Sequence, residues 1–202
     1  MLPHLAPMLA VPSAPFDSDA HCFEVKWDGI RALAAVEDHG WHLWGRAQAD
    51  YTARYPELEI LRALPAGTLL DGELVAVSAG LPDLGRLLRR HGLVDPWKIA
   101  QARHWCAVQY VVFDLLYDRG RSLLREPLWR RQQALAELGQ RQALPGVWQA
   151  PGVVGAGQAY YTAVVALGHE GVMAKLLSAA YRPGRRGAAW RKIKPGRAGR
   201  SR

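Results

Sequence analysis

The chain has 202 residues, half of them hydrophobic, which is enough to bury the core of one good-sized domain. Lysine and arginine outnumber the acids by 26 to 18, and this excess favours an anionic partner. The two cysteines, Cys22 and Cys106, are isolated and lack metal-binding spacing, which argues against a zinc site or a disulfide framework and suits a reducing cytoplasm.

The basic excess is confined to the end of the chain. Residues 171–202 hold ten lysines or arginines and no acid, whereas the first 170 residues hold 16 bases and 18 acids. A solvated basic tail is the simplest interpretation of such a block, and it suits residues 196–202, which we expect to be flexible. Between Lys175 and Lys194, however, Tyr181 and Trp190 are interleaved with the charges, which indicates a folded basic region.

No membrane segment is expected. Prolines at positions 3, 7, 12 and 15 interrupt the apolar N-terminal stretch, so it does not resemble a signal peptide. The uncharged stretch from Gln142 to Gly168 is long enough to cross a bilayer, but its prolines and glycines argue against a membrane helix. These patterns predict a cytoplasmic protein.

The first part of the chain is predicted to be rich in strands. Residues 1–20 read as an extended, proline-rich segment that leads into the domain over residues 21–195. Apolar and polar residues alternate over Cys22–Trp27, and strands are also predicted over Arg31–Glu37 and Trp41–Trp44. The turn signal Asp38–Gly40 joins the last two into a hairpin.

Helices and further strands follow in the rest of the chain. Pro56 suits the first turn of a short helix over Tyr55–Leu64, and Asp83 suits the N-cap of a helix that reaches His91 and stops at Gly92. The other predicted elements are helices over Pro127–Leu138, ended by Gly139, and Gln158–Leu167, and strands over Leu69–Val77, Ala107–Leu116, Val172–Leu177 and Ala189–Ile193. Together they predict an α+β fold of antiparallel β-sheets flanked by a few helices.

One run carries the strongest chemical signal. In Phe23–Arg31 a lysine, Lys26, stands between the acids Glu24 and Asp28, on the same face of a predicted strand end. Gly29 then permits a sharp turn or a close approach to the backbone. Alone, this run also suits an ordinary charged strand face.

Four further motifs occur downstream in a fixed order, namely Asp71–Val75, Val112–Asp114, Glu170–Lys175 and Trp190–Pro195. With the run around Lys26 they resemble the adenylation (nucleotidyltransferase) domain of ATP-dependent DNA ligases, most like the bacterial ligases associated with end-joining repair. The resemblance extends from about Pro7 to Pro195. It implies an ATP-grasp-like covalent nucleotidyltransferase fold with a nucleotide cleft between the sheets.

The resemblance also implies roles for individual residues. Lys26 would attack the α-phosphate of ATP and carry AMP. The other implied roles are Glu24 at adenine, Phe113 stacked on the base, Glu73 at a ribose hydroxyl, Arg31 at ribose or phosphate, Arg46 at the nucleotide, Lys192 and Lys194 at the α-phosphate, and Glu170 with Asp28 at Mg²⁺ or Mn²⁺. Arg46 departs from the family pattern, because Gly45 and Ala47 flank it instead of the usual neighbours.

The chemistry demands that Lys26 react as the free amine. The pKa of a free lysine is about 10.4, so the site must lower it. Burial, the metal ion and the two late lysines would lower that pKa, while Glu24 and Asp28 would raise it, and the sequence leaves the balance open.

Some of these residues have simpler interpretations. Phe113 lies in an apolar run and suits a core position, and Asp71 precedes Gly72 and suits a turn. Lys192 and Lys194 suit a solvated strand face.

Nicked double-stranded DNA is the implied partner. Arg182, Arg185 and Arg186, in a loop with proline and glycine, are candidate phosphate contacts. Ligases of this kind usually continue into an oligonucleotide-binding barrel (an OB-fold domain), whereas this chain ends eight residues after Lys194. The chain is therefore either a fragment or a naturally reduced protein, and the tail, which does not resemble the start of a strand-rich domain, favours the second. Lysine adenylation is then expected to be slow or to need help from a protein partner that supplies the missing domain. An RNA ligase or capping-type enzyme, or a non-catalytic nucleic-acid-binding module of the same fold, are the competing interpretations.

Overall fold

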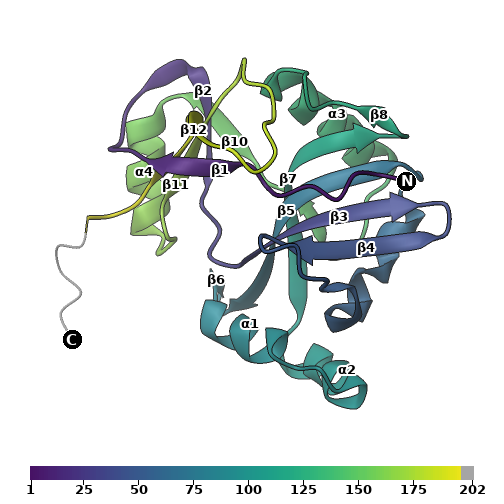
Figure 1. The fold of residues 1–202 in the computed structure, drawn as a ribbon. Coiled ribbons are helices and arrows are strands. Elements are labelled where there is room, and N and C mark those ends of the chain that lie inside the picture. The colour runs from purple at the N-terminus through teal and green to yellow at the C-terminus, as the bar shows by residue number, and fades with distance from the viewer. Residues whose placement is uncertain (197–202) are drawn as a thin grey trace.

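The computed structural model describes residues 1–196, which form two β-sheets that pack against each other and carry helices on their outer sides (Figure 1). The small sheet has five strands, in the order β1 (Leu9–Pro12), β12 (Arg186–Ile193), β11 (Val172–Leu176), β2 (Ser18–Val25) and β10 (Gly152–Gly155). Its strand pairs are antiparallel except β1 with β12.

The large sheet has seven strands. Five follow the order β4 (Gly40–Gly45), β3 (Ile30–Glu37), β5 (Thr68–Ser78), β7 (Val108–Asp118) and β8 (Arg121–Ser122), while β6 (Leu81–Pro82) pairs with β5 and β9 (Val147–Gln149) pairs with β7. Only the β7–β9 pair is parallel. The result confirms the α+β class and the antiparallel sheets that the sequence predicts.

Three apolar clusters hold the layers together. One lies between the outer face of the large sheet and the helices η2 (Pro56–Ala63), α1 (Leu84–His91) and α3 (Leu128–Arg141). A second joins Phe23 and Val172 of the small sheet to helix α4 (Gly157–Ala166). The third lies between the two sheets and includes Trp190 from β12 and Phe113 from β7. The space that the third cluster leaves open is the candidate site.

The chain passes between the sheets at several points. Residues 26–29 connect β2 to β3, and residues 150–151 connect β9 to β10. The N-terminal segment also spans both sheets: the Trp44 indole donates to the Leu5 carbonyl at 2.8 Å, and β1 then pairs with β12. The segment expected to lead into the domain therefore contains β1 and the start of β2, as Figure 1 shows in purple.

Most predicted elements are present, with two corrections. The short helix predicted from Pro56 is confirmed, and it is a 3₁₀ helix. Gly139 does not end α3, which continues to Arg141, because the cost of one helical glycine, about 1 kcal/mol, is small against the burial of Leu135 and Leu138. The sequence patterns also failed to reveal the helix α2 (Pro96–Trp105), as well as the short strands β6, β8, β9 and β10 and the 3₁₀ turn η1 (Thr52–Arg54).

The cap predictions are confirmed. The Asp83 side chain accepts a hydrogen bond from the Arg86 backbone N–H, and Gly92 closes α1. None of the helices within residues 1–196 has the length and apolar character to cross a membrane. The basic tail predicted to be flexible, apart from Gly196, lies outside the described residues.

Candidate active site

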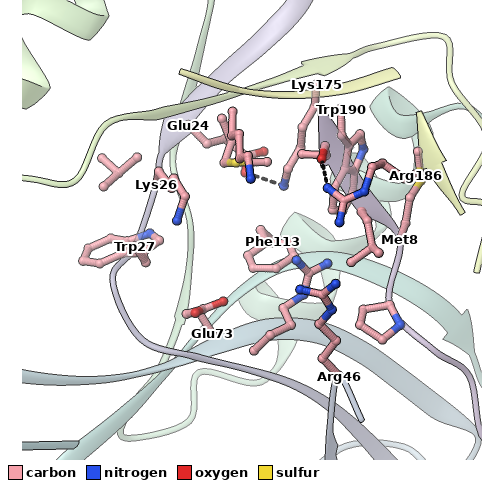
Figure 2. A pocket seen from close by; sticks show the side chains of 17 residues that line it. Met8, Glu24, Lys26, Trp27, Arg46, Glu73, Phe113, Lys175, Arg186 and Trp190 are labelled. Carbon is pink, nitrogen blue, oxygen red and sulfur yellow. Dashed lines mark hydrogen bonds and ion pairs between the residues drawn. The ribbon is translucent and has the colours of Figure 1, made fainter. Parts of the chain in front are cut away.

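A cavity of about 220 Å³ lies between the two sheets. Figure 2 shows Lys26 and Trp27 at one end of it, Arg46 and Arg186 at the other, and Glu24, Phe113 and Lys175 between them. Six basic side chains line it (Lys26, Arg31, Arg46, Lys175, Arg186 and Lys192) against two acidic ones (Glu24 and Glu73). Such a surplus of positive charge suits an anionic ligand such as a polyphosphate.

Lys26 lies where the chain leaves the small sheet. Its backbone N–H donates to the Gly171 carbonyl at 2.8 Å, which fixes the start of the crossover to the start of β11. Its ammonium forms an ion pair with Glu170, and Lys194 forms an ion pair with the other oxygen of the same carboxylate. The Lys26 side chain is only 21% exposed. The lysine predicted to be the nucleophile thus faces the cavity, with Glu170 and the late lysines nearby.

Glu170 is held in its charged form. Partial burial raises the pKa of its carboxyl group, but the hydrogen bonds and charges of Lys194 and Lys26 outweigh burial and keep this pKa below its ordinary value. Gly171 follows at φ +143°, where a Cβ would lie 2.1 Å from the Ile193 carbonyl oxygen. Only glycine fits there, and it brings Glu170 close to the end of β12.

Gly29 allows the crossover to approach the large sheet. A Cβ on Gly29 would lie 2.1 Å from the Leu74 carbonyl oxygen and 2.9 Å from Glu73 Cγ. Of the two roles considered from the sequence, close approach is therefore the one that the structure supports. This approach brings Lys26 to the same cavity as Glu73.

A hydrogen-bond network joins Arg31 of β3 to Asp71 of the neighbouring strand β5 and to Tyr181 of the loop between β11 and β12. Arg31 donates to both oxygens of Asp71, at 2.5 and 2.6 Å, and Tyr181 donates to Asp71 at 2.6 Å. Tyr181 in turn accepts from the Met8 backbone N–H at 2.9 Å. The turn interpretation of Asp71 is wrong, because this residue lies inside β5 and is fully buried. Its role is to fix the arginine that lines the cavity.

Glu73 is the second acid of the lining. Burial raises the pKa of its carboxyl group to about 7, against the opposing charges of Arg31 and Lys26. Glu73 is adjacent in sequence to Leu74, whose side chain points the other way into the outer core. The alternation of β5 therefore presents Glu73 to the cavity and Leu74 to the outer core.

Glu24 is almost fully buried and has two donors. Its Oε2 accepts from Lys175 at 2.5 Å, and its Oε1 accepts from the Gln132 amide at 2.8 Å. Burial raises the pKa of Glu24, and the Lys175 charge counteracts part of that rise. Losing one partner of such a buried pair typically costs about 3–5 kcal/mol.

Phe113 belongs both to the core and to the site. It is 9% exposed, packs in the cluster between the sheets and lines the cavity. The Lys175 ammonium lies 4.1 Å from the centre of its ring, and the Arg31 guanidinium lies 4.5 Å from it. Both the core interpretation and a place in the cavity therefore hold for this residue.

The structure gathers most predicted residues in one place. Eight line the cavity: Glu24, Lys26, Arg31, Arg46, Glu73, Phe113, Arg186 and Lys192. Glu170 lies beside the cavity through its ion pair with Lys26, and Lys194 lies there through its ion pair with Glu170. Asp28 lies in the crossover, and Arg182 and Arg185 are exposed in the loop between β11 and β12. The solvated interpretation suits Lys194, 43% exposed, better than Lys192.

The donor set fits a magnesium ion only in part. Within residues 1–196 no group of three or more His, Cys, Asp or Glu side chains is placed to hold a metal. Mg²⁺, however, is usually bound by one or two carboxylates together with substrate phosphates, so a single carboxylate such as Glu170 beside a cavity rich in positive charge is compatible with it.

Sequence reasoning missed Lys175 and Gln132. A signal for Lys175 existed, because alternation along β11 places it on the same face as Met173, and both line the cavity. A lone lysine in so short and apolar a strand also requires an acidic partner. No sequence signal marked Gln132, which reaches Glu24 from α3 across 108 residues of chain.

Comparison with known proteins shows the family to which this chain belongs. The family model described as "ATP dependent DNA ligase domain" matches residues 6–194. A probable DNA ligase of Anaeromyxobacter sp. is 34% identical over 96% of this chain and 38% of its own length. The SPbeta prophage-derived DNA ligase-like protein LigB of Bacillus subtilis is 32% identical over 89% of this chain and 63% of its own length. The chain thus spans less than two thirds of these relatives.

Solved structures show the same fold. The ligase domain of M. tuberculosis LigD has a TM-score of 0.80 and 32% identity over 94% of this chain and 60% of that one. A mycobacterial DNA ligase D complexed with ATP and MES has a TM-score of 0.77, with the same identity and coverage. The match over nearly the whole chain, together with the shared fold, establishes that this chain belongs to the family of ATP dependent DNA ligase domains.

Proposed function

We propose that this chain is the adenylation unit of an ATP-dependent DNA ligase and that Lys26 carries AMP during nick sealing in DNA repair. The observation that carries the proposal is the position of Lys26, at one end of a cavity with a surplus of basic side chains and in an ion pair with Glu170. A lysine amine that faces a cavity rich in positive charge supports nucleotidyl transfer through that amine.

The reaction has three steps. Lys26 Nζ forms a bond to the α-phosphorus of ATP, the bond from that phosphorus to the bridging oxygen breaks, pyrophosphate leaves and the nitrogen releases a proton to water. An oxygen of the DNA 5′-phosphate then attacks the same phosphorus, the P–N bond breaks and the lysine nitrogen regains a proton. Finally the 3′-hydroxyl attacks the phosphorus of the DNA 5′-phosphate, loses its proton and displaces AMP.

The lining supplies charge stabilisation for these steps. Phosphoryl-type transfer depends mainly on positioning and on positive charge near the transferred group. Lys192 lies in the same cavity as Lys26, and Lys194 lies close by at Glu170, which supports a role for both at the α-phosphate. Arg31 is fixed by Asp71 and suits ribose or phosphate, and Glu73 suits a ribose hydroxyl.

Mg²⁺ or Mn²⁺ would be held by Glu170, with Asp28 as a helper, together with phosphate oxygens. When bound, the cation neutralises charge on the phosphates. The carboxylate of Glu170 interacts with both Lys26 and Lys194, so its engagement by a cation would release the two ammonium groups from their common partner.

Covalent labelling tests the proposal directly. The chain is incubated with α-labelled ATP and Mg²⁺ and separated by denaturing electrophoresis. We expect label on the parent protein and none on Lys26→Ala. The matched control is Lys98→Ala, which removes an exposed lysine on α2 and should leave labelling unchanged. Label that persists in Lys26→Ala would contradict the proposal.

A separate experiment tests which nucleic acid accepts AMP from the protein. The labelled protein is mixed with nicked duplexes of DNA or of RNA, and transfer of AMP to the 5′-phosphate is followed. We expect transfer to DNA. Preferential transfer to RNA would favour an RNA ligase or a capping-type enzyme, and nucleic-acid binding without any labelling would favour a non-catalytic module.

A further inference from the structure

The carboxylate of Glu24 is oriented by two donors that come from different elements. Lys175 reaches its Oε2 from the neighbouring strand β11, and Gln132 reaches its Oε1 from α3. Glu24 is 2% exposed and Lys175 is 1% exposed, yet both line the cavity. The proposed phosphate chemistry at Lys26 uses neither Lys175 nor Gln132.

This arrangement leaves Glu24 as a pure acceptor towards the cavity. An ionised carboxylate has about four lone-pair positions and no hydrogen to donate. The protein occupies one position on each oxygen, so acceptor capacity remains for a ligand. The group that a ligand presents to Glu24 must therefore carry an N–H or O–H.

We propose that Lys175 and Gln132 are specificity-determining positioning residues, which hold Glu24 as the acceptor for the exocyclic amine of adenine and thereby select ATP over a triphosphate whose base carries an oxygen at that place. The inference rests on the proposed function, because it takes ATP as the nucleotide. It assigns a role to two residues on the grounds of their hydrogen bonds to Glu24.

The donors of adenine identify its 6-amine as the group that Glu24 would accept from. Adenine joined to ribose has one N–H donor group, its 6-amine, so an acceptor-only carboxylate can hydrogen-bond adenine only there. Inosine has a carbonyl oxygen at position 6 and carries its N–H on the ring instead. The oxygen would face a carboxylate without a hydrogen between them, and sites built for a hydrogen bond discriminate strongly against such analogues.

The charge of Lys175 decides whether Glu24 is a charged acceptor or a protonated donor of hydrogen bonds. Without a counter-charge, burial favours the protonated acid, which donates a hydrogen bond and would accept a carbonyl oxygen. The variant Lys175→Met should therefore weaken ATP binding and favour ITP relative to it. Gln132→Leu removes only one orienting donor and should act in the same direction with a smaller effect.

The experiment compares the binding and the label transfer of two nucleotides, ATP and ITP, in four proteins. Equilibrium binding of ATP and ITP, by calorimetry, is combined with the rate of label transfer from each α-labelled nucleotide. The proteins are the parent chain, Lys175→Met, Gln132→Leu and the control Gln133→Leu, whose amide lies at the surface and bonds Glu137. We expect the parent to prefer ATP by about 100-fold, in line with one unsatisfied hydrogen-bonding group in a buried site.

The ratio of ATP affinity to ITP affinity is the quantity that tests the inference. We expect it to fall about tenfold or more in Lys175→Met, several-fold in Gln132→Leu and not at all in Gln133→Leu. A purely structural role would lower ATP and ITP binding by the same factor, and that result would overturn the inference. Gln132→Leu decides the question if Lys175→Met fails to fold.

The outcomes separate the inference from the proposed function. Selective ATP binding that depends on Lys175 or Gln132, without label on Lys26, would support the inference and contradict lysine adenylation. Label on Lys26 with an unchanged nucleotide ratio in both variants would do the reverse. A parent chain that binds neither nucleotide would overturn both.

Discussion

Individual charged residues of the cavity differ in how firmly the protein fixes their state. Glu170 is held ionised, because the hydrogen bonds and charges of Lys194 and Lys26 keep the pKa of its carboxyl group below its ordinary value. Glu73 is different, because burial raises the pKa of its carboxyl group to about 7. Around neutral pH this one acid is therefore divided between its charged and neutral forms in the empty cavity.

The pH dependence of stability, measured without nucleotide, should reveal the raised pKa of Glu73. The folded pKa of Glu73 lies above its unfolded value, so ionisation is easier in the unfolded chain, and stability is lost as pH rises through the folded value. In Glu73→Gln that loss is absent. We expect the unfolding free energy of the variant, relative to the parent, to increase from pH 4.5 to 7 by up to about 3 kcal/mol and then to level off.

Urea unfolding of both proteins at several pH values, without nucleotide, measures this difference. Glu170→Gln is the contrasting variant, because its carboxyl group has a lowered pKa and its trend should have the opposite sign. A difference between Glu73→Gln and the parent that does not change with pH would contradict the assignment.

At the scale of elements, the short crossover from β2 to β3 decides where the nucleophile lies. The backbone N–H of Lys26 bonds the Gly171 carbonyl, and Gly29 lies directly against the Leu74 carbonyl. These two contacts tie the crossover to β11 on one side and to β5 on the other. Lys26 is therefore positioned by backbone contacts as well as by its ion pair with Glu170.

Gly29→Ala should disturb both stability and labelling. The added methyl group would lie 2.1 Å from the Leu74 carbonyl oxygen, so the crossover must move. We expect a loss of about 1–3 kcal/mol in unfolding free energy and a strong reduction in Lys26 labelling. Gly187→Ala in β12 is the matched control, because its methyl group would meet no atom within 4 Å. Equal effects of the two substitutions would show that the close approach does not matter.

At the scale of the whole molecule, positive charge extends from the cavity to the loop between β11 and β12. Arg186 lines the cavity and donates to the Ala10 carbonyl, while Arg182 and Arg185 are exposed further along the loop. This continuity suits a DNA backbone that passes the mouth of the cavity.

The triple variant of Arg182, Arg185 and Arg186 to alanine tests that surface. Each neutralised phosphate contributes about 0.9 to the slope of log affinity against log salt. We expect weaker binding to nicked duplexes of any sequence and a slope shallower by about 2 to 3, measured by fluorescence anisotropy at several salt concentrations. The control triple, Arg62, Arg89 and Arg103 to alanine, removes exposed charges from η2, α1 and α2. If the two triples behave alike, DNA does not bind at the loop.

The main strands could be predicted from local patterns, whereas most of the predicted residues that line the cavity came from motifs that resemble those of a known family. Alternation marked β2, the turn signal at Asp38–Gly40 marked the hairpin of β3 and β4, and the cap residue Asp83 marked α1. The short edge strands could not be predicted in this way, because β9 and β10 are only three and four residues long and form through pairing with distant strands.

The same limit explains the residues that were missed or misread. Asp71 looked like a turn residue because its partners, Arg31 and Tyr181, are 40 and 110 positions away. Gln132 resembles any surface glutamine of a helix until α3 packs near β2. Side chains whose partners are distant in sequence acquire their function only from the tertiary fold.

Connections between the two sheets have a consequence for how a ligand arrives. The N-terminal segment, both crossovers and the Tyr181 loop each tie one sheet to the other. These links oppose a large separation of the two sheets, so the cavity is already formed before a ligand binds. Little binding free energy is then lost in a conformational change. Capture of a triphosphate should then be governed by diffusion and electrostatic attraction, and its association rate should fall as ionic strength rises.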